Sequence, residues 1–246
     1  MVRHKARSKI SKSFLNFWES TTSKEVARER ARYVLKPINE YHEQTEKILE
    51  IGCGLGEVLV NLPERYAIYG LDIEKDCIEI CRKKIPKGKF FVSSMHNFRI
   101  DEKFDVIFSV YTVNFLKDFD QWKSTFRAVN EHLNREGLFI FDVYTQKMLR
   151  DTLQSLKKHD RSTSSFRKFS KGYCHEDEIV KGDIRILDTG IFERLPNGLY
   201  QLNKYRRKER VYPIPKMKSA LSEHFDILEA NLREEGRKIL FVCRKK

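Results

Sequence analysis

Short apolar runs alternate with amphipathic stretches through the first 145 residues. The runs cover residues 47–51, 67–72, 89–92, 104–110 and 138–143, and several of them are almost continuously apolar. Such runs are typical of parallel strands buried on both faces, whereas half-exposed strands alternate apolar and polar residues. We therefore predict an α/β fold with a doubly wound, mostly parallel sheet.

Helical periodicity fills the segments between these runs. Helices are predicted over residues 25–41 and along an apolar stripe from Phe119 to Leu133 that includes Trp122. A further helix is predicted directly after the first strand, where apolar residues follow the spacing i, i+3, i+4, i+7: Leu55, Val58, Leu59 and Leu62. Because Trp122 belongs to a regular stripe, we expect it in the core.

The chain changes character after residue 145. Residues 146–212 begin with a helical piece and continue in long stretches with strand character, and Pro196-Asn197-Gly198 between the last two is a strong hairpin signal. Residues 213–246 predict a last helix and a closing pair of strands. We therefore expect three parts: residues 1–145, with an N-terminal cap helix and most of the sheet; an antiparallel β insertion (146–212) before the last helix; and residues 213–246, which complete a seven-stranded sheet.

Composition restricts the class of protein. The 246 residues include 48 Lys and Arg against 35 Asp and Glu, a net charge of +13 that favours anionic partners. The basic residues concentrate at 3–12, in KYRRKER (204–210) and in the last three residues. No apolar run reaches the roughly 20 residues that span a bilayer, and no secretory signal is evident, so we expect a cytoplasmic protein without a membrane partner. Five cysteines without CxxC spacing indicate neither a disulfide framework nor a metal site.

A glycine-rich turn follows the first predicted strand. Gly52, Gly54 and Gly56 stand in the sequence ILEIGCGLGE, and an acidic residue, Asp72, ends the second strand. Glycines let a ligand approach the main chain, and a carboxylate at the end of the second strand can accept hydrogen bonds from both hydroxyls of a ribose. This combination predicts a nucleoside site.

The spacing of these residues resembles the first motif of class I S-adenosylmethionine-dependent methyltransferases. A dinucleotide fold would place the third glycine three residues after the second, whereas Gly56 follows Gly54 by two and Glu50 precedes Gly52 by two. The segments SSM (93–95), FDVIFSV (104–110) and HLNREGLFIFDV (132–143) follow in the order of that family. The resemblance implies a Rossmann-like methyltransferase fold and S-adenosylmethionine as cofactor, with S-adenosylhomocysteine as product.

Carried over position by position, the resemblance assigns the cofactor site. It implies that the methionine part of the cofactor lies against the glycine loop, the ribose on Asp72 and the adenine on Ile73. Ser94 takes the place where the family usually has an Asp that accepts from the adenine amino group. The N-terminal segment with Trp18 either closes over the cofactor or is a loosely packed leader. The full set is Glu50, Gly52, Cys53, Gly54, Gly56, Asp72, Ile73, Ser94, Met95, Ser109 and Trp18.

The sequence indicates the molecule that receives the methyl group less closely than it indicates the cofactor. Tyr111 and Asn114 follow the fourth strand and are the candidate catalytic residues, next to the methyl to be transferred in line to an amine or hydroxyl. The antiparallel insertion resembles that of small-molecule methyltransferases, including amino-sugar N-methyltransferases, and its basic residues suit an anionic acceptor. The alternative is an RNA methyltransferase or RNA-binding module, because aromatic residues alternate with Lys and Arg in NKYRRKERVY. The sequence does not determine the oligomeric state.

Overall fold

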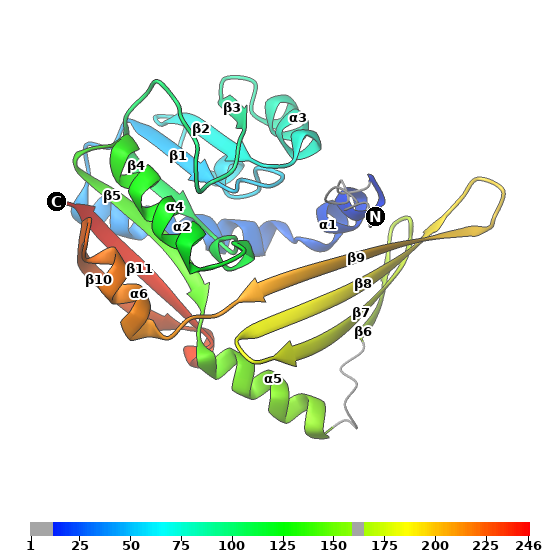
Figure 1. Ribbon diagram of the computed structural model, residues 1–246. Coiled ribbons are helices and arrows are strands. Elements are labelled where there is room, and N and C mark those ends of the chain that lie inside the picture. The colour runs from blue at the N-terminus through cyan, green and yellow to red at the C-terminus, as the bar shows by residue number, and fades with distance from the viewer. Residues whose placement is uncertain (1–11, 159–164) are drawn as a thin grey trace, which may run out of the picture.

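The main sheet of this computed structural model is mixed and mostly parallel (Figure 1). Within residues 12–158 and 165–246, which the structure describes, it has seven strands in the order β10-β11-β5-β4-β1-β2-β3. The order reverses between β1 and β4, and in open α/β sheets ligands bind beyond the carboxyl ends of the strands at such a point. The strands are β1 (Lys47–Ile51), β2 (Ala67–Asp72), β3 (Lys89–Val92), β4 (Phe104–Ser109), β5 (Leu133–Tyr144), β10 (Phe225–Arg233) and β11 (Lys238–Lys245).

Helices cover both faces of this sheet, so the predicted doubly wound fold is confirmed. Side chains of α2 (Lys24–Tyr41) and α3 (Lys75–Lys84) pack with one set of strand residues, while α4 (Phe119–His132) and α6 (Ile214–Leu221) pack with the other set. Trp122 on α4 is fully buried, as expected. In the described main sheet, β11 is the one strand whose direction is opposite to that of the others, because it pairs antiparallel with both β5 and β10.

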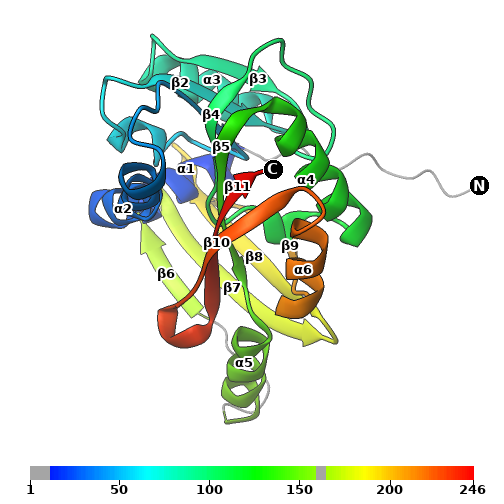
Figure 2. The ribbon, with the colours of Figure 1, turned by 90° about the vertical axis from the view of Figure 1, so that its left-hand side faces the viewer.

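The insertion forms a second sheet beside the first (Figures 1 and 2). After α5 (Gln146–Lys158), four antiparallel strands follow in sequence order: β6 (Ser165–Phe169), β7 (Gly172–Lys181), β8 (Ile184–Arg194) and β9 (Tyr200–Arg210). The predicted hairpin lies between β8 and β9, where the N–H of Leu195 donates to the carbonyl of Leu199. The antiparallel insertion is therefore confirmed.

The chain contains a helix that the sequence pattern did not indicate, α1 (Lys12–Thr21). Its aromatic residues explain why it is held in place. The ring of Phe14 packs at 4.6 Å on that of Tyr205 of β9, inclined by 42°, and Phe17 meets Phe169 of β6 edge-on at 5.6 Å. The helix thus packs on the second sheet, while the basic residues at 3–9 lie outside the described residues.

The predicted helix after β1 is wrong. Only a 3₁₀ turn, Leu59–Asn61, forms in this segment. Leu55, Val58, Leu59 and Leu62 are nevertheless all buried, so the spacing that resembled a helix reflects turns packed on the sheet. The positive φ of Gly56 interrupts regular helical geometry at the start of the segment. No helix N-terminus therefore follows the glycine loop directly, and any ligand there would meet the N–H groups of a turn.

Candidate functional site

The glycine loop is tied to the neighbouring strand. The three glycines at 52, 54 and 56 have φ values of +75°, +51° and +72°. The N–H groups of Gly52 and Cys53 both donate to the carbonyl of Leu71, at 2.7 and 2.9 Å. The left-handed backbone and these two bonds hold the loop at the carboxyl ends of β1 and β2, the place expected for a nucleoside ligand.

Side chains approach the loop so closely that only glycine fits. A Cβ on Gly52 would collide with Thr112 and lie 3.0 Å from the terminal carbon of Met95. A Cβ on Gly54 would lie 2.7 Å from the indole of Trp18. Trp18, on α1, therefore borders the loop, as Thr112 and Met95 do. The main chain between them is the surface that the sequence pattern assigned to a cofactor.

Glu50 carries a buried oxygen that needs a donor. The residue lies on β1 and is 3% exposed, and its Oε2 has no hydrogen-bond partner among the described residues. Burial raises the pKa of this carboxyl well above its ordinary value. Because a buried acceptor without a donor is costly, an ammonium group of a ligand beside the loop would satisfy Glu50 and favour its charged form.

Asp72 is fixed by main-chain donors. Its Oδ2 accepts from the N–H of Gly54 at 2.8 Å and its Oδ1 from the N–H of Glu74 at 2.9 Å. A carboxylate has about four lone-pair sites, so each oxygen retains room for a second hydrogen bond. Burial raises the pKa of Asp72 although the main-chain donors oppose the shift. The acid is held in a fixed direction at the end of β2, as binding of a diol requires.

The remaining predicted cofactor residues differ in their surroundings. Ile73 is 46% exposed and so presents an apolar side chain on which a planar ring could pack. The hydroxyl of Ser94 is engaged with Nδ1 of His96. Cys53 is buried, with its sulfur 4.0 Å from that of Cys81. The hydroxyl of Ser109 donates to the carbonyl of Ile51 at 2.9 Å inside the protein, which makes Ser109 a brace between β4 and β1.

Tyr111 has a left-handed backbone directly after β4. Its φ is 60°, which is uncommon for a residue other than glycine, and its N–H donates to Oδ1 of Asp142 at 2.6 Å. Its hydroxyl donates to Glu234, and Arg30 lies 4.2 Å from the centre of its ring. Burial raises the pKa of this hydroxyl. A non-glycine residue with positive φ at the end of a central strand is typical of functional sites, where surrounding bonds maintain the strain.

A buried lysine lies beneath Tyr111. Lys238, at the start of β11, is 2% exposed and donates to Oδ2 of Asp142 at 3.1 Å, while Glu234 lies 3.7 Å away. Burial lowers the pKa of Lys238 although the two carboxylates oppose the shift. Asp142 thus joins the amine of Lys238 to the backbone of Tyr111, so the lysine supports the conformation of the tyrosine.

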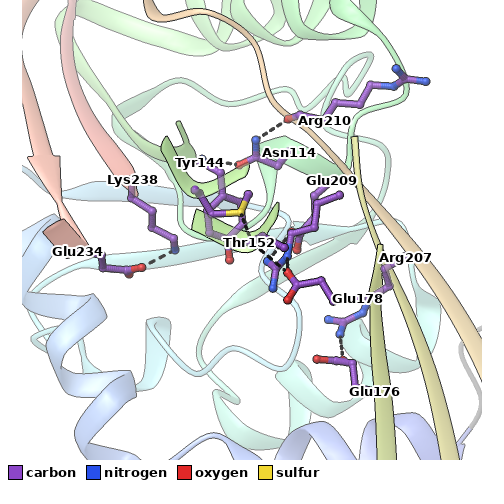
Figure 3. Close-up of polar contacts among 12 residues, drawn as sticks. Asn114, Tyr144, Thr152, Glu176, Glu178, Arg207, Glu209, Arg210, Glu234 and Lys238 are labelled. Atoms are coloured by element: carbon purple, nitrogen blue, oxygen red, sulfur yellow. Dashed lines mark hydrogen bonds and ion pairs between the residues drawn. The ribbon is translucent and has the colours of Figure 1, made fainter. Parts of the chain in front are cut away.

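Asn114 connects the two sheets (Figure 3). Its Nδ2 donates to the carbonyl of Arg210 at 2.6 Å, and its Oδ1 accepts from the N–H of Tyr144 at 3.0 Å. Asn114 is buried. Both ends of its amide are therefore bound to main chain, one at the end of β9 and the other at the end of β5.

The part of the second sheet's covered face that lies nearest Tyr144 of β5 is polar and balanced in charge (Figure 3). Arg185 on β8 forms ion pairs with Glu178 on β7 and, at 2.9 Å, with the buried Glu209 on β9. Its guanidinium also lies 5.5 Å from the ring of Tyr144. Next along this face, Arg207 pairs with Glu176 at 2.7 Å, and Glu176 also lies 3.6 Å from Arg167. These residues set three arginines against three glutamates.

Sequence reasoning did not find this part of the site. Asp142 lies within one apolar run and Lys238 begins another. Because a charged residue is rarely buried without a partner, these two positions were the signal of a buried ion pair. Arg185, Glu178 and Glu209 lie on strands whose pattern gave no indication of which face would be covered.

A cavity elsewhere in the described residues does not point to a site. A polar cavity of about 580 Å³ opens at the amino ends of β1 and β4, away from the glycine loop, where the carboxylate of Asp105 accepts from the N–H groups of Glu46 and Lys47. Across residues 12–158 and 165–246, His, Cys, Asp and Glu form no group of three that could hold a metal ion. No helix in the described part of the chain is long and apolar enough to cross a membrane.

Comparisons with known proteins agree with this geometry. A family model described as a methyltransferase domain matches residues 48–137, from β1 to the start of the apolar half of β5. A Geobacillus protein (strain WCH70) that is named as a methyltransferase is 25% identical over 234 residues, covering 87% of this chain and 90% of that protein. The malonyl-[acyl-carrier protein] O-methyltransferase of Bacillus anthracis is 26% identical over 174 residues, covering 65% of this chain and 64% of that enzyme.

The fold is also that of a solved methyltransferase. CalS10 from Micromonospora echinaspora, an amino pentose methyltransferase solved with S-adenosylmethionine bound, superimposes with a TM-score of 0.72 at 15% identity, covering 99% of this chain and 100% of that chain. The matched domain contains the glycine loop and Asp72, and the unpartnered oxygen of Glu50 fits an ammonium group. The chain therefore carries a methyltransferase domain on the fold of S-adenosylmethionine-dependent methyltransferases, and its cofactor is S-adenosylmethionine.

Proposed function

We propose that this enzyme methylates an amine of a small polar molecule held between the carboxyl edge of the main sheet and the charge-balanced face of the second sheet. The observation that carries the proposal is this face, on which Arg185, paired with Glu209, lies against Tyr144 at the end of β5. Asn114 holds the main chain of Tyr144 there (Figure 3). Paired charges and tyrosines offer both hydrogen-bond donors and hydrogen-bond acceptors to a polar molecule that receives the methyl group. The amino pentose named for CalS10 is an acceptor of this kind.

The cofactor would lie along the glycine loop. Oε2 of Glu50 would accept from its ammonium group, the main chain of residues 52–56 would contact its methionine part, and Asp72 would accept from the ribose hydroxyls. Ile73 would pack on the adenine, with Ser94 and Met95 beside it, and Trp18 would cover the loop. The bound cofactor supplies a methyl group on a sulfonium that is a good leaving group, so positioning and removal of water provide much of the rate enhancement.

An amine is favoured over a hydroxyl because the tyrosines here are poor bases. Burial raises the pKa of both Tyr111 and Tyr144, so each hydroxyl stays protonated and acts as a donor. A hydroxyl acceptor would need a general base, whereas a neutral amine needs none. Tyr111 is therefore proposed to orient the acceptor, and Asn114, whose amide is bound at both ends, to position Tyr144 and β9.

The paired charges on the same face also bear on the charge of the methyl acceptor. Each arginine on it is paired with a glutamate, so it has no excess positive charge to attract an anion. This arrangement does not favour the anionic acceptor that the basic insertion suggested. Of the basic residues of β9 that motivated the RNA alternative, Arg207 lies on this face, whereas Lys204, Arg206 and Lys208 lie on the opposite one, because side chains alternate along the strand.

The test compares matched acceptors. Purified protein is incubated with methyl-labelled S-adenosylmethionine and pairs of small sugars that differ only in an amino or a hydroxyl group at one carbon. We expect label in at least one amino sugar and none in its hydroxyl partner, with S-adenosylhomocysteine formed in equal amount. Transfer to the hydroxyl partner instead would overturn the choice of amine. Cofactor binding measured by calorimetry, together with no transfer to any small acceptor, would overturn the proposed acceptor class.

A further inference from the structure

The second sheet has another face, turned away from the main sheet. In antiparallel strands directly paired residues point to the same side. The elements that pack on this sheet contact the side of Arg185, Glu178 and Tyr205. Neighbours along each strand point the other way. That second side consists of six registered rows: Arg194 and Tyr200; Lys168, Tyr173, Phe192 and Leu202; Phe166, His175, Gly190 and Lys204; Asp177, Asp188 and Arg206; Ile179, Ile186 and Lys208; Lys181, Ile184 and Arg210.

Aromatic side chains gather at the hairpin end of this face. Phe166 is 63% exposed, Tyr200 is 49% exposed and Leu202 is 45% exposed, values that are high for such large apolar residues. The rings of Phe166 and Tyr173 are stacked, with centres 5.4 Å apart and planes inclined by 22°. The centre of the Tyr200 ring lies 6.0 Å from that of Tyr173. The three rings thus form a continuous exposed platform across strands β6, β7 and β9.

Positive charge surrounds the platform. Lys204, Arg206 and Lys208 all project from β9 on this side and are exposed, and Lys168 and Arg194 flank the rings. The acidic residues of the same rows are Asp177 and Asp188, and Arg206 forms an ion pair with Asp188. Lys181 and Arg210 of the last row bring the total to seven cations against two carboxylates, which leaves an excess of positive charge. The other face of the same sheet has three arginines against four glutamates, with Glu193 as the fourth, so the basic character of the insertion belongs to this side.

We propose that this face binds single-stranded nucleic acid, with bases stacked on Phe166, Tyr173 and Tyr200 and phosphates on the surrounding lysines and arginines. Exposed aromatic rings within a basic surface are how proteins bind unpaired strands, because every base has a face that can stack. A duplex offers no free base faces to the rings. A second copy of this chain is the less suitable occupant, since pairing two such faces would bring like charges together. The proposal is independent of the methyl acceptor, because the platform lies on the opposite side of the sheet from the acceptor face.

The test measures binding of a fluorescein-labelled oligouridine of about 12 nucleotides by fluorescence anisotropy, at salt concentrations from about 50 to about 200 mM. If Lys168, Arg194, Lys204 and Lys208 each neutralise one phosphate, the slope of log K against log salt is about −2.8, a roughly 50-fold loss of affinity over this range. We expect a duplex of the same length to bind more weakly than the single strand.

Substitutions locate the site. Phe166→Ala and Tyr200→Ala should each weaken binding about fivefold or more, the lower limit for loss of one stacked base. The double variant Lys204→Gln/Lys208→Gln should reduce the slope to about −1.4. A control with equal loss of charge, Lys83→Gln/Lys87→Gln, removes two exposed lysines near the end of α3 and should leave affinity within about twofold. All of these positions are partly or fully exposed, so folding should be preserved.

Three results would overturn the proposal. One is the absence of binding to the single strand at the lowest salt concentration. Another is equal loss of affinity in the β9 variant and the α3 control, which would indicate attraction by the overall charge alone. The third comes from sedimentation of the wild type and Tyr200→Ala: a wild-type dimer that Tyr200→Ala dissociates would assign the platform to a second copy of the chain.

Discussion

The carboxylate oxygen of Glu50 that lacks a partner leads to two predictions for the substitution Glu50→Gln: weaker binding of the cofactor and a more stable free protein. Glu50→Gln keeps the shape of the side chain but removes its charge. If Oε2 accepts from the cofactor ammonium, a charge-assisted hydrogen bond worth about 1.5–3 kcal/mol is lost, and S-adenosylmethionine should bind about 10- to 150-fold more weakly. In the free protein the same substitution removes the charge of a buried carboxylate that has no donor, so above the folded-state pKa it should stabilise the fold by about 1 kcal/mol, a rise of roughly 2–4 °C in Tm.

The effect should depend on pH in a defined direction. The pKa of Glu50 in the folded state is raised above its ordinary value of 4.5 by burial, so the folded protein holds this proton more tightly than the unfolded chain does. The free wild type should therefore lose stability as the pH rises from about 4.5 towards the folded-state pKa, and Glu50→Gln should remove that loss. Tm by differential scanning calorimetry against pH, with and without cofactor, measures both effects.

Glu209→Gln is the matched control. Glu209 is also a buried glutamate whose pKa is raised by burial, but Arg185 donates to it at 2.9 Å and it lies on the second sheet. Breaking this pair should destabilise the fold by about 3–5 kcal/mol and leave the affinity for S-adenosylmethionine unchanged. If Glu50→Gln lowered Tm as this control does, or bound the cofactor as tightly as the wild type, the role assigned to Glu50 would be refuted.

Three further substitutions test other parts of the site. Gly54→Ala should weaken cofactor binding at least tenfold and more than Gly182→Ala, because both positions have a positive φ (+51° and +56°) but only the former would press against Trp18; calorimetric titration compares them. Lys238→Met should destabilise the protein by about 3–5 kcal/mol in urea unfolding, since its carboxylate partner would stay buried without a cation; a loss below 1 kcal/mol would contradict the buried pair. Tyr111→Phe should lower kcat about tenfold while cofactor affinity stays within twofold, and an unchanged kcat would exclude a part in orienting the acceptor.

The agreement between sequence and structure was greatest where burial is complete. The central strands β1, β4 and β5 were predicted because both their faces are covered, which makes the sequence apolar whatever the neighbouring element is. The segment after β1 shows the limit of this reasoning. Its apolar spacing suited a helix, but the left-handed Gly56 and packing of consecutive turns produced the same burial without one. The short helix α1 was missed because its aromatic residues owe their burial to the distant strands β6 and β9.

The sequence by itself determined the methyl donor. Glycine spacing, Glu50 and Asp72 lie within 23 consecutive positions, and their geometry depends on one strand, one turn and the next strand. Only the tertiary structure decided the surroundings of the acceptor. Pairing of β7, β8 and β9 placed Arg185, Glu178 and Glu209 on the covered face and left the excess lysines on the other, and folding of β11 against β5 brought Lys238 to Asp142. These contacts join residues up to 96 positions apart, and which face of a strand is covered depends on what packs there.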